Sequence, residues 1–413
     1  MEKKTKQIAA IVAIVVIAAA SGIGVWLYLS LRSPYWVTPG APSDITEDQY
    51  IKVGCLGDLN DIQGQGNYKG AYLRAKELNE AGGVTVGNTT YYFALAKEDT
   101  GESRPVLDES IGLAAAQRLL DAGAEFFVGG FRTESCEVYR EPIMDAQKIF
   151  FGTGSADNGM CEAVDEDYPK YKYWFRTMPI NGTALATQQL WFIVALQGYL
   201  NNTYYPTEEI DTAVILRENL DWTDAFNNTN TFHLGLEGLT GMTVHDYPYD
   251  SAATAEDFDD IWDDIKGLGA DIVIPVISAG TGIFMSSKWK ASAAPCIVSG
   301  INVESQEKSY WDETDGAGEY ETTMVPLTRT NKTEITLDYY DRFIAQWGAP
   351  PLYTATGAYD SLTLLHDAIN QTKSFDVDTL ITYFEGGEWV GTSASVNKFI
   401  FTVNHDILAW MGP

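Results

Sequence analysis

Short apolar segments of strand length alternate with longer amphipathic segments of helical length along this chain. In the first series the strand-like segments are 51–56, 91–96, 126–128 and 149–151, and the helix-like segments are 68–81, 107–122 and 135–146. Strands that alternate with helices of this length form parallel sheets covered by helices on both faces. The pattern therefore predicts an α/β fold.

The same alternation starts again in the second half of the chain. Helix-like segments span 183–196, 222–234 and 255–268, and strand-like segments span 212–216, 242–247 and 272–277. Pro275 interrupts the last strand and favours an edge or irregular position, because proline cannot donate to a ladder. Two such series predict two lobes with separate parallel sheets. The cleft between them would lie where the carboxyl ends of the strands face each other.

Residues 8–31 are 24 consecutive uncharged residues, most of them apolar. As a helix they span roughly 36 Å, enough to cross a bilayer. Three lysines precede the segment and only Arg32 follows it closely, so the positive-inside rule places residues 1–7 in the cytoplasm and the rest of the chain outside. A cleaved signal peptide is the alternative, but the apolar segment is long for one. We expect a single-pass anchor in the cell membrane.

A proline-rich stalk at 32–49 separates this anchor from the folded region. Six Asn-x-Ser/Thr triplets follow the anchor, and they begin at Asn88, Asn181, Asn201, Asn227, Asn331 and Asn370. Such triplets are acceptors for N-glycosylation on extracytoplasmic surfaces. We therefore expect an extracellular glycoprotein beyond about residue 32.

The four cysteines are too few and too scattered for a disulfide scaffold or a zinc site. Cys136 and Cys161 fall in neighbouring loops of the first lobe, so we expect one disulfide bond between them. Cys55 and Cys296 lie in apolar strand-like segments and are expected to be buried thiols.

The net charge, the absence of catalytic motifs and the spacing of the histidines disfavour several classes of function. A formal net charge of −30 disfavours binding to nucleic acid. The chain contains no phosphate-binding loop motif, and segment 152–156 lacks the final glycine of a nucleophilic serine turn. The four histidines are far apart, which disfavours a metal site. We expect neither an enzyme nor a cofactor.

The order of four segments resembles a known family. These segments are 51–83, which contains Leu78-Asn79-Glu80-Ala81-Gly82-Gly83, then 98–130, 256–273 and 357–362. Together, over about residues 50–410, they resemble the type I periplasmic binding proteins, specifically the branched-chain amino acid and amide-binding branch of ABC transporter substrate-binding proteins. This resemblance implies two Rossmann-like lobes joined by three hinge crossings, near residues 178–179, 324–326 and 396–397.

The resemblance also implies domain boundaries and a function. Lobe 1 would contain residues 50–178 and 327–394, and lobe 2 would contain residues 179–326 and 395–413. The protein would capture a small polar solute, such as an amino acid, an amide or a short peptide, and deliver it to the permease and ATPase subunits of an ABC importer. A ligand-sensing ectodomain and a glycosylated cell-surface scaffold or adhesion component remain alternatives.

The ligand-binding residues are inferred from positions that match the family. They are Gln63, Thr133, Glu134, Ser135, Thr153, Ser155, Ala156, Trp222, Ser278 and Asn302. Thr133 and Ser135 can equally be helix caps, and Trp222 can equally pack between the lobes. Glu134 departs from the family pattern, because a glutamate there would repel a ligand carboxylate unless Arg132 compensates it.

Overall fold

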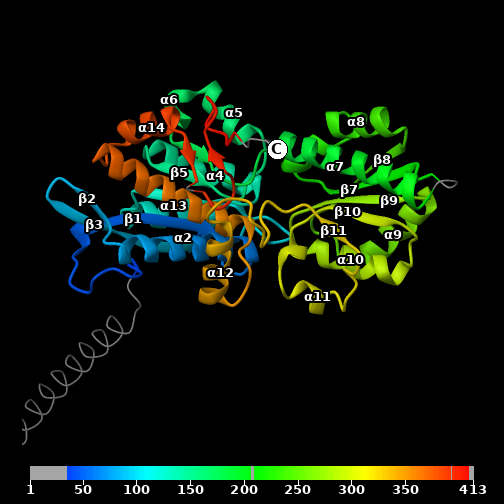
Figure 1. The fold of residues 1–413 in the computed structure, drawn as a ribbon, viewed down its shortest axis with the longest axis horizontal. Coiled ribbons are helices and arrows are strands. Elements are labelled where there is room, and N and C mark those ends of the chain that lie inside the picture. The colour runs from blue at the N-terminus through cyan, green and yellow to red at the C-terminus, as the bar shows by residue number, and fades with distance from the viewer. Residues whose placement is uncertain (1–34, 206–208, 392, 409–413) are drawn as a thin grey trace, which may run out of the picture. The chain divides into compact units, whose positions relative to one another are not determined.

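A computed structural model describes residues 35–205, 209–391 and 393–408. The predicted membrane anchor at 8–31 lies outside the described residues. Within the described ranges, no helix is both long and apolar enough to cross a membrane. The folded body is the unit Thr38–Pro413. It contains two large sheets, and each of them together with its helices is called a lobe (Figure 1). A small antiparallel sheet pairs β12 (Trp389–Val390) with β13 (Lys398–Phe399).

The sheet of lobe 1 has six strands in the order β2-β3-β1-β4-β5-β6. They are β1 (Tyr50–Gly57), β2 (Val84–Val86), β3 (Thr89–Asp99), β4 (Phe126–Gly129), β5 (Ile149–Gly152) and β6 (Trp174–Arg176). Only the edge pair β2–β3 is antiparallel. Both faces of β4 and β5 are buried, as expected for a parallel sheet between helices.

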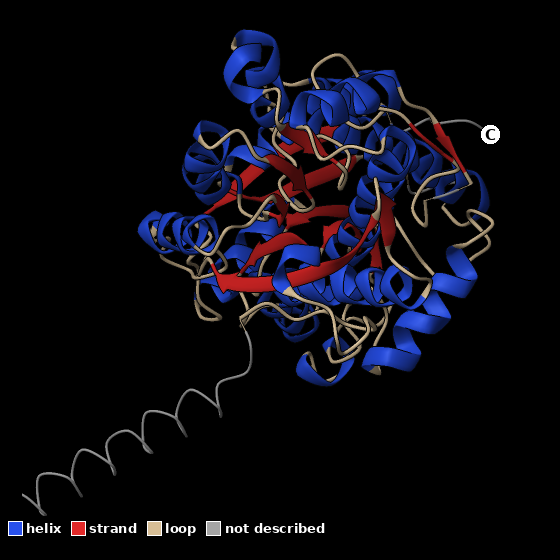
Figure 2. Ribbon diagram, turned by 90° about the vertical axis from the view of Figure 1, so that its left-hand side faces the viewer, coloured by secondary structure: helices blue, strands red, loops and turns tan. Residues whose placement is uncertain are grey.

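The helices of lobe 1 come from two separate parts of the chain. They are α2 (Ile62–Glu80), α3 (Glu109–Asp121), α4 (Thr133–Asp145), α5 (Gly159–Glu166) and α6 (Tyr168–Tyr171), and later α12 (Thr336–Trp347), α13 (Tyr353–Thr372) and α14 (Val377–Gly386). Helices flank the strands on both sides in Figure 2. The α/β fold predicted from the alternation is therefore confirmed.

Helix α2 begins six residues earlier than the predicted segment 68–81. Asp61 caps it by accepting a hydrogen bond from the Gln63 backbone N–H at 3.2 Å. Glycines in the first turns allow a close approach to α13: a Cβ on Gly70 would lie 1.9 Å from the Ala355 carbonyl oxygen. A residue without a side chain at position 70 is thus required for the packing of α2 on α13.

The sheet of lobe 2 has five parallel strands in the order β11-β10-β9-β7-β8. They are β7 (Thr212–Glu218), β8 (Thr243–Tyr249), β9 (Ile272–Ile277), β10 (Ile297–Asn302) and β11 (Thr322–Thr323), with helices α7 (Gly182–Thr203), α8 (Thr231–Thr240), α9 (Asp257–Leu268), α10 (Thr281–Ser292) and α11 (Tyr310–Glu313). Pro275 lies in the central strand β9, not at an edge. The β9–β10 ladder is interrupted there, opposite Gly300.

The chain passes from lobe 1 to lobe 2 after β6 and returns after β11, at the two hinge positions predicted near 178–179 and 324–326. The expected third crossing and the assignment of the C-terminal segment to lobe 2 differ from the structure over residues 395–408; residues 409–413 lie outside the described residues. The described C-terminal residues lie on lobe 1, where the Phe401 ring is 4.9 Å from the Phe175 ring and Asp406 pairs with the buried Arg176 at 2.9 Å. A buried guanidinium requires a carboxylate partner, and Asp406 supplies it.

The predicted disulfide bond is wrong, because all four cysteines are free thiols. Cys136, in α4, lies against Gly130 and interacts with Tyr139. Cys161, in α5, lies instead beside Arg176 and Trp174. Burial raises the pKa of Cys161 to about 11. The two thiols therefore have separate surroundings inside lobe 1.

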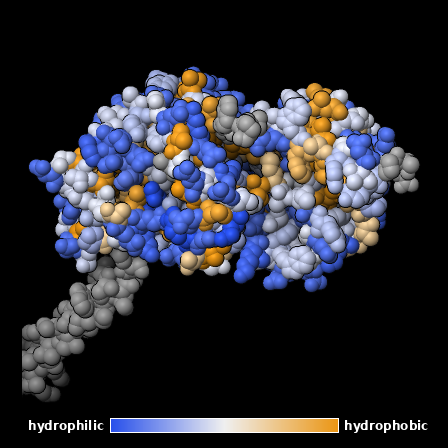
Figure 3. Space-filling view, in the orientation of Figure 1, coloured by the Kyte–Doolittle hydropathy of each residue, from blue (hydrophilic) through white to orange (hydrophobic). Residues whose placement is uncertain are grey.

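Large apolar side chains are exposed on the outer helices of lobe 2. Trp191 and Phe192 on α7, and Leu234 and Leu239 on α8, are each at least half exposed. Orange atoms mark this part of lobe 2 in Figure 3. Both helices still bury their opposite faces in the core, through residues such as Ile193.

Candidate functional site

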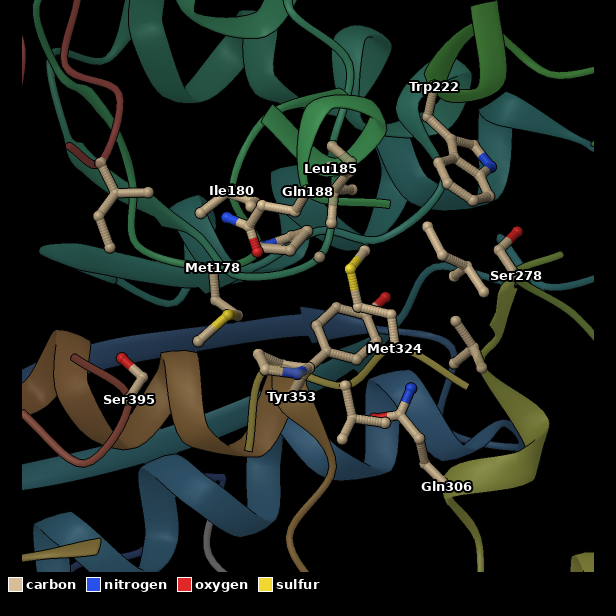
Figure 4. Close-up of a pocket in the computed structure, with 18 of the residues that line it drawn as sticks. Met178, Ile180, Leu185, Gln188, Trp222, Ser278, Gln306, Met324, Tyr353 and Ser395 are labelled. Carbon is tan, nitrogen blue, oxygen red and sulfur yellow. The ribbon is translucent and has the colours of Figure 1, made fainter. Parts of the chain in front are cut away.

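A cavity of about 700 Å³ lies between the lobes, at the level of the two hinges. We call it the hinge cavity. Lobe 1 contributes the loops after β4 and β5, and lobe 2 contributes the loops after β7, β9 and β10. Figure 4 shows Met178 and Met324, one from each hinge, close to the ring of Tyr353 at the start of α13.

The lining of the hinge cavity is mainly apolar. Its apolar members are Phe131, Ala156, Met178, Pro179, Ile180, Leu185, Leu220, Trp222, Ile301, Val303, Met324, Val325, Pro326, Tyr353, Val396 and Ile407. Polar groups are few, as in most small-molecule sites. They include the amides of Gln188 and Gln306 and the hydroxyl of Ser278. This lining is more apolar than we expected for an amino acid, an amide or a short peptide.

Every charged residue that lines the hinge cavity is basic. Arg132, Lys332 and Lys398 belong to the lining, and the described lining includes neither aspartate nor glutamate. This contrasts with the whole chain, in which 57 acidic residues outnumber 27 basic ones. The cavity thus differs in charge from the rest of the protein.

Three of the predicted ligand-binding residues line this cavity: Ala156, Trp222 and Ser278. Trp222 is 8% exposed, and its indole N–H has no hydrogen-bond partner among the described residues. Figure 4 shows it at one side of the cavity, near Ser278. The structure therefore brings one lobe 1 and two lobe 2 residues of the prediction together.

The predicted hydroxyl residues of lobe 1 are buried and do not line the cavity. The Thr133 and Ser155 hydroxyls form a hydrogen bond with each other at 3.0 Å. The Thr153 hydroxyl donates to the side-chain oxygen of Asn67. Ser135 is fully buried, and its hydroxyl has no partner among the described residues. The hydrogen bonds of Thr133, Ser155 and Thr153 thus lie within lobe 1.

The amino end of α4, where we expected a ligand carboxylate, already holds a carboxylate of the protein. Glu102 accepts hydrogen bonds from the backbone N–H groups of Phe131 and Arg132 at 3.2 and 3.1 Å, and from the Tyr139 hydroxyl at 3.2 Å. Burial raises the pKa of Glu102 to about 7. Sequence reasoning missed Glu102 because it lies in a loop without a motif.

The compensation of Glu134 by Arg132 is present, with Nε of Arg132 3.3 Å from Oε2 of Glu134. The other oxygen of Glu134 accepts a hydrogen bond from the backbone N–H of Asp221 in lobe 2 at 3.4 Å. Glu134 therefore links the lobes directly. Asn302 does not line the cavity, since its amide donates to Glu321 at 2.8 Å and to Tyr310 at 2.9 Å within lobe 2.

A second set of contacts between the lobes consists of polar residues, and we call it the polar seam: Asp61, Gln63, Glu218, Ser278 and Glu304. The fully buried Gln63 of lobe 1 donates from its amide to the Ser278 carbonyl of lobe 2 at 2.8 Å. Glu218 accepts from the Ser278 backbone N–H at 2.9 Å and from its hydroxyl at 2.6 Å.

Burial raises the pKa values of the acids in the polar seam. The pKa of Asp61 rises to about 6, and that of Glu218 also rises. The pKa of Glu304 rises to about 8, first because of burial and second because of the nearby charge of Asp61 across the lobe boundary. The Glu304 side chain has no hydrogen bond among the described residues, so no donor opposes the effect of burial.

A family model for periplasmic binding proteins matches residues 51–407. The chain belongs to this family. Its relatives are solute-binding proteins of ABC transporters and not enzymes. No curated protein matches the chain significantly in sequence.

Solved structures share the fold at low sequence identity. A solute-binding protein of an ABC transporter from R. palustris, in complex with benzoate, is 15% identical, with a TM-score of 0.69 over 87% of this chain and 91% of that chain. An ABC transporter substrate-binding protein from Desulfitobacterium hafniense, in complex with Leu, is 19% identical, with a TM-score of 0.61 over 87% and 95%. LivJ from Streptococcus pneumoniae, in complex with isoleucine, is 14% identical, with a TM-score of 0.62 over 87% and 98%.

Proposed function

We propose that the chain is a membrane-anchored, extracytoplasmic substrate-binding protein that captures a small organic solute in the hinge cavity. It delivers this solute to the permease and ATPase subunits of an ABC importer. The observation that carries the proposal is a cavity of about 700 Å³ with both lobes and both hinges in its lining. A solute that touches both lobes favours the closed arrangement, and the permease can distinguish that arrangement from the open one.

The solutes bound by similar proteins support this reading. The relatives hold benzoate, leucine and isoleucine, which are small carboxylates with an apolar body. A thermal-shift screen of the full-length chain against amino acids, carboxylates, amides and short peptides tests the proposal. A solute at a hundred times its Kd stabilises the folded protein by about 2.7 kcal/mol. If no member of the screen raises the melting temperature, solute capture is wrong.

The location is proposed from the sequence. The uncharged segment 8–31 and the lysines before it support a single-pass anchor with the folded body outside. Alkaline carbonate should leave the full-length chain in the membrane fraction and release a chain that lacks residues 1–32. Protease added to intact cells should digest the body. Digestion only after lysis would contradict the proposed orientation.

N-glycosylation is proposed on the same basis. Asn88 and Asn331 are exposed, which suits glycan attachment. Asn181 is less suited, because its side chain caps α7 through Ala184 and donates to Asp406 at 2.9 Å. A glycosidase that removes N-glycans should increase the gel mobility of the native protein, and Asn88→Gln with Asn331→Gln should reduce that shift.

A further inference from the structure

The hinge cavity offers a solute two kinds of surface. Most of the lining consists of sulfur-containing, aliphatic and aromatic side chains, which favour an apolar solute body. The charged lining is entirely basic among the described residues. A solute that fits both surfaces has an apolar body and an acidic group.

Lys332 is the lining cation that is available to such a group. It follows the second hinge, and its ammonium group donates to the Pro326 carbonyl at 2.7 Å. No carboxylate of the described residues lies within ion-pair distance of it, whereas Lys398 pairs with Glu388 at 2.8 Å and Arg132 pairs with Glu134 at 3.3 Å. Although part of the Lys332 side chain is exposed, desolvation lowers its pKa, and the charge of the buried Asp360 only partly opposes this shift. An anion beside it would compensate for this loss of hydration.

The amino end of α4 is a less favourable anion site than Lys332. Glu102 already accepts the N–H groups of Phe131 and Arg132 before α4. A second carboxylate there would meet a buried acid of like charge and would find these donors occupied. A basic side chain of the lining is therefore the more favourable partner for an acidic solute.

The lining also lacks a partner for an ammonium group. Buried acids lie behind the lining, where Glu218 accepts from Ser278 at 2.6 Å and Asp360 accepts from Ser395 at 2.7 Å, but none of them belongs to the described lining. Glu218 is occupied by Ser278 and Thr281. A zwitterionic α-amino acid would thus bury its positive group without a counter-charge, which is costly. A solute without an ammonium group avoids that cost.

We infer that the solute is an apolar carboxylate without an ammonium group, and that its carboxylate pairs with Lys332 at the second hinge. This inference rests on the proposed function and specifies its solute class. The pairing joins a lobe 1 residue beside the hinge to a solute whose body contacts lobe 2 residues such as Trp222. Binding would therefore couple charge recognition to lobe closure.

The experiment compares acids with their neutral amides. Calorimetric titrations of the full-length chain use benzoate, benzamide, cyclohexanecarboxylate, cyclohexanecarboxamide and leucine. We expect both carboxylates to bind at least tenfold more tightly than their amides and than leucine. Lys332→Gln should weaken carboxylate binding about tenfold and change amide binding less than twofold.

Lys290→Gln is the matched control, because Lys290 is also exposed and also donates to a backbone carbonyl, that of Asp315, at 3.0 Å. It lies on α10, outside the cavity lining, and should leave all affinities unchanged. Equal binding of acids and amides, or carboxylate binding that does not respond to Lys332→Gln, overturns the inference while solute capture stands. Tight leucine binding does the same. If none of these probes binds and the wider screen is also negative, both proposals fail.

Discussion

The polar seam and the hinge cavity share Ser278, but they differ in how many hydrogen-bond partners the protein provides for their polar groups. In the seam, buried polar side chains bind one another: Gln63 donates to Ser278, and Ser278 donates to Glu218. In the cavity the lining is apolar, and its polar groups, such as the indole N–H of Trp222 and the ammonium of Lys332, have few or no partners in the protein.

This difference separates two tasks that a cleft of this kind must perform. The seam stabilises the contact between the lobes without a solute, because hydrogen bonds link Gln63 to Ser278 and Ser278 to Glu218. The cavity leaves apolar surface and a cation for a solute to cover. The residues expected to bind an amino acid are therefore mostly part of the internal structure, and those that face the cavity favour a different chemistry.

The largest expected effect comes from breaking the seam at Glu218. Glu218→Ala leaves the backbone N–H and hydroxyl of Ser278 and the hydroxyl of Thr281 without their acceptor. Buried donors without partners should lower the free energy of unfolding by about 3 kcal/mol. Urea denaturation measures this. Glu218→Gln keeps one acceptor oxygen and should cost about 1 kcal/mol, and equal losses in both variants would mean that these hydrogen bonds are unimportant.

The second largest expected effect is a loss of solute affinity when Trp222 in the hinge cavity is replaced. Trp222→Ala removes the largest apolar side chain of the lining and should weaken binding of the best solute from the screen by about 2 kcal/mol, or roughly thirtyfold. Trp222→Phe keeps an aromatic surface and should recover most of the affinity. Calorimetry distinguishes this from the packing role, in which Trp222→Ala lowers the melting temperature but leaves the affinity unchanged.

The seam should also respond to pH through Glu304. Its folded pKa of about 8 lies above the ordinary value of 4.5, so protonation stabilises the folded form fully below pH about 4.5. This contribution is lost as the pH rises toward 8 and above. We expect the free energy of unfolding to fall by on the order of 1–2 kcal/mol between pH 5 and pH 8.

Glu304→Gln should flatten this pH dependence, because an amide does not titrate. Glu307→Gln is the control, since Glu307 is a nearby acid on the same loop and lies further from full burial. If Glu304→Gln and the unmodified chain lose the same free energy of unfolding between pH 5 and pH 8, Glu304 is not responsible for the pH dependence.

The sequence predicted the fold well because its signal is local. Strand and helix periodicity need only neighbouring residues, and both sheets follow from it. The C-terminal residues were misassigned because their position depends on distant partners. Phe401 packs on Phe175, and Asp406 neutralises Arg176. No local pattern near residue 400 indicates that a buried arginine more than 200 residues earlier lacks a partner.

The site was predicted less well for a related reason. The family resemblance indicated the loops at the carboxyl ends of the strands, and Ala156, Trp222 and Ser278 do line the cavity. It could not show that Glu102 fills the amino end of α4. It also missed Lys332 and the hinge methionines, because hinge segments have no periodic pattern. A mainly apolar cavity wall whose charged residues are all basic is a property of three-dimensional packing, and only the structure displays it.

The smallest expected effect tests the link between the lobes. Gln63→Ala removes the 2.8 Å hydrogen bond to the Ser278 carbonyl and should shift the balance toward the open arrangement by about 1 kcal/mol. Distances between spin labels on the two lobes should lengthen or broaden without solute and return on saturation with the best solute. Gln65→Ala is the control, because Gln65 lies on the same helix and accepts from Lys69 within lobe 1. If both variants give the same distances as the unmodified chain, the seam does not hold the lobes together, and closure depends on the cavity and its solute alone.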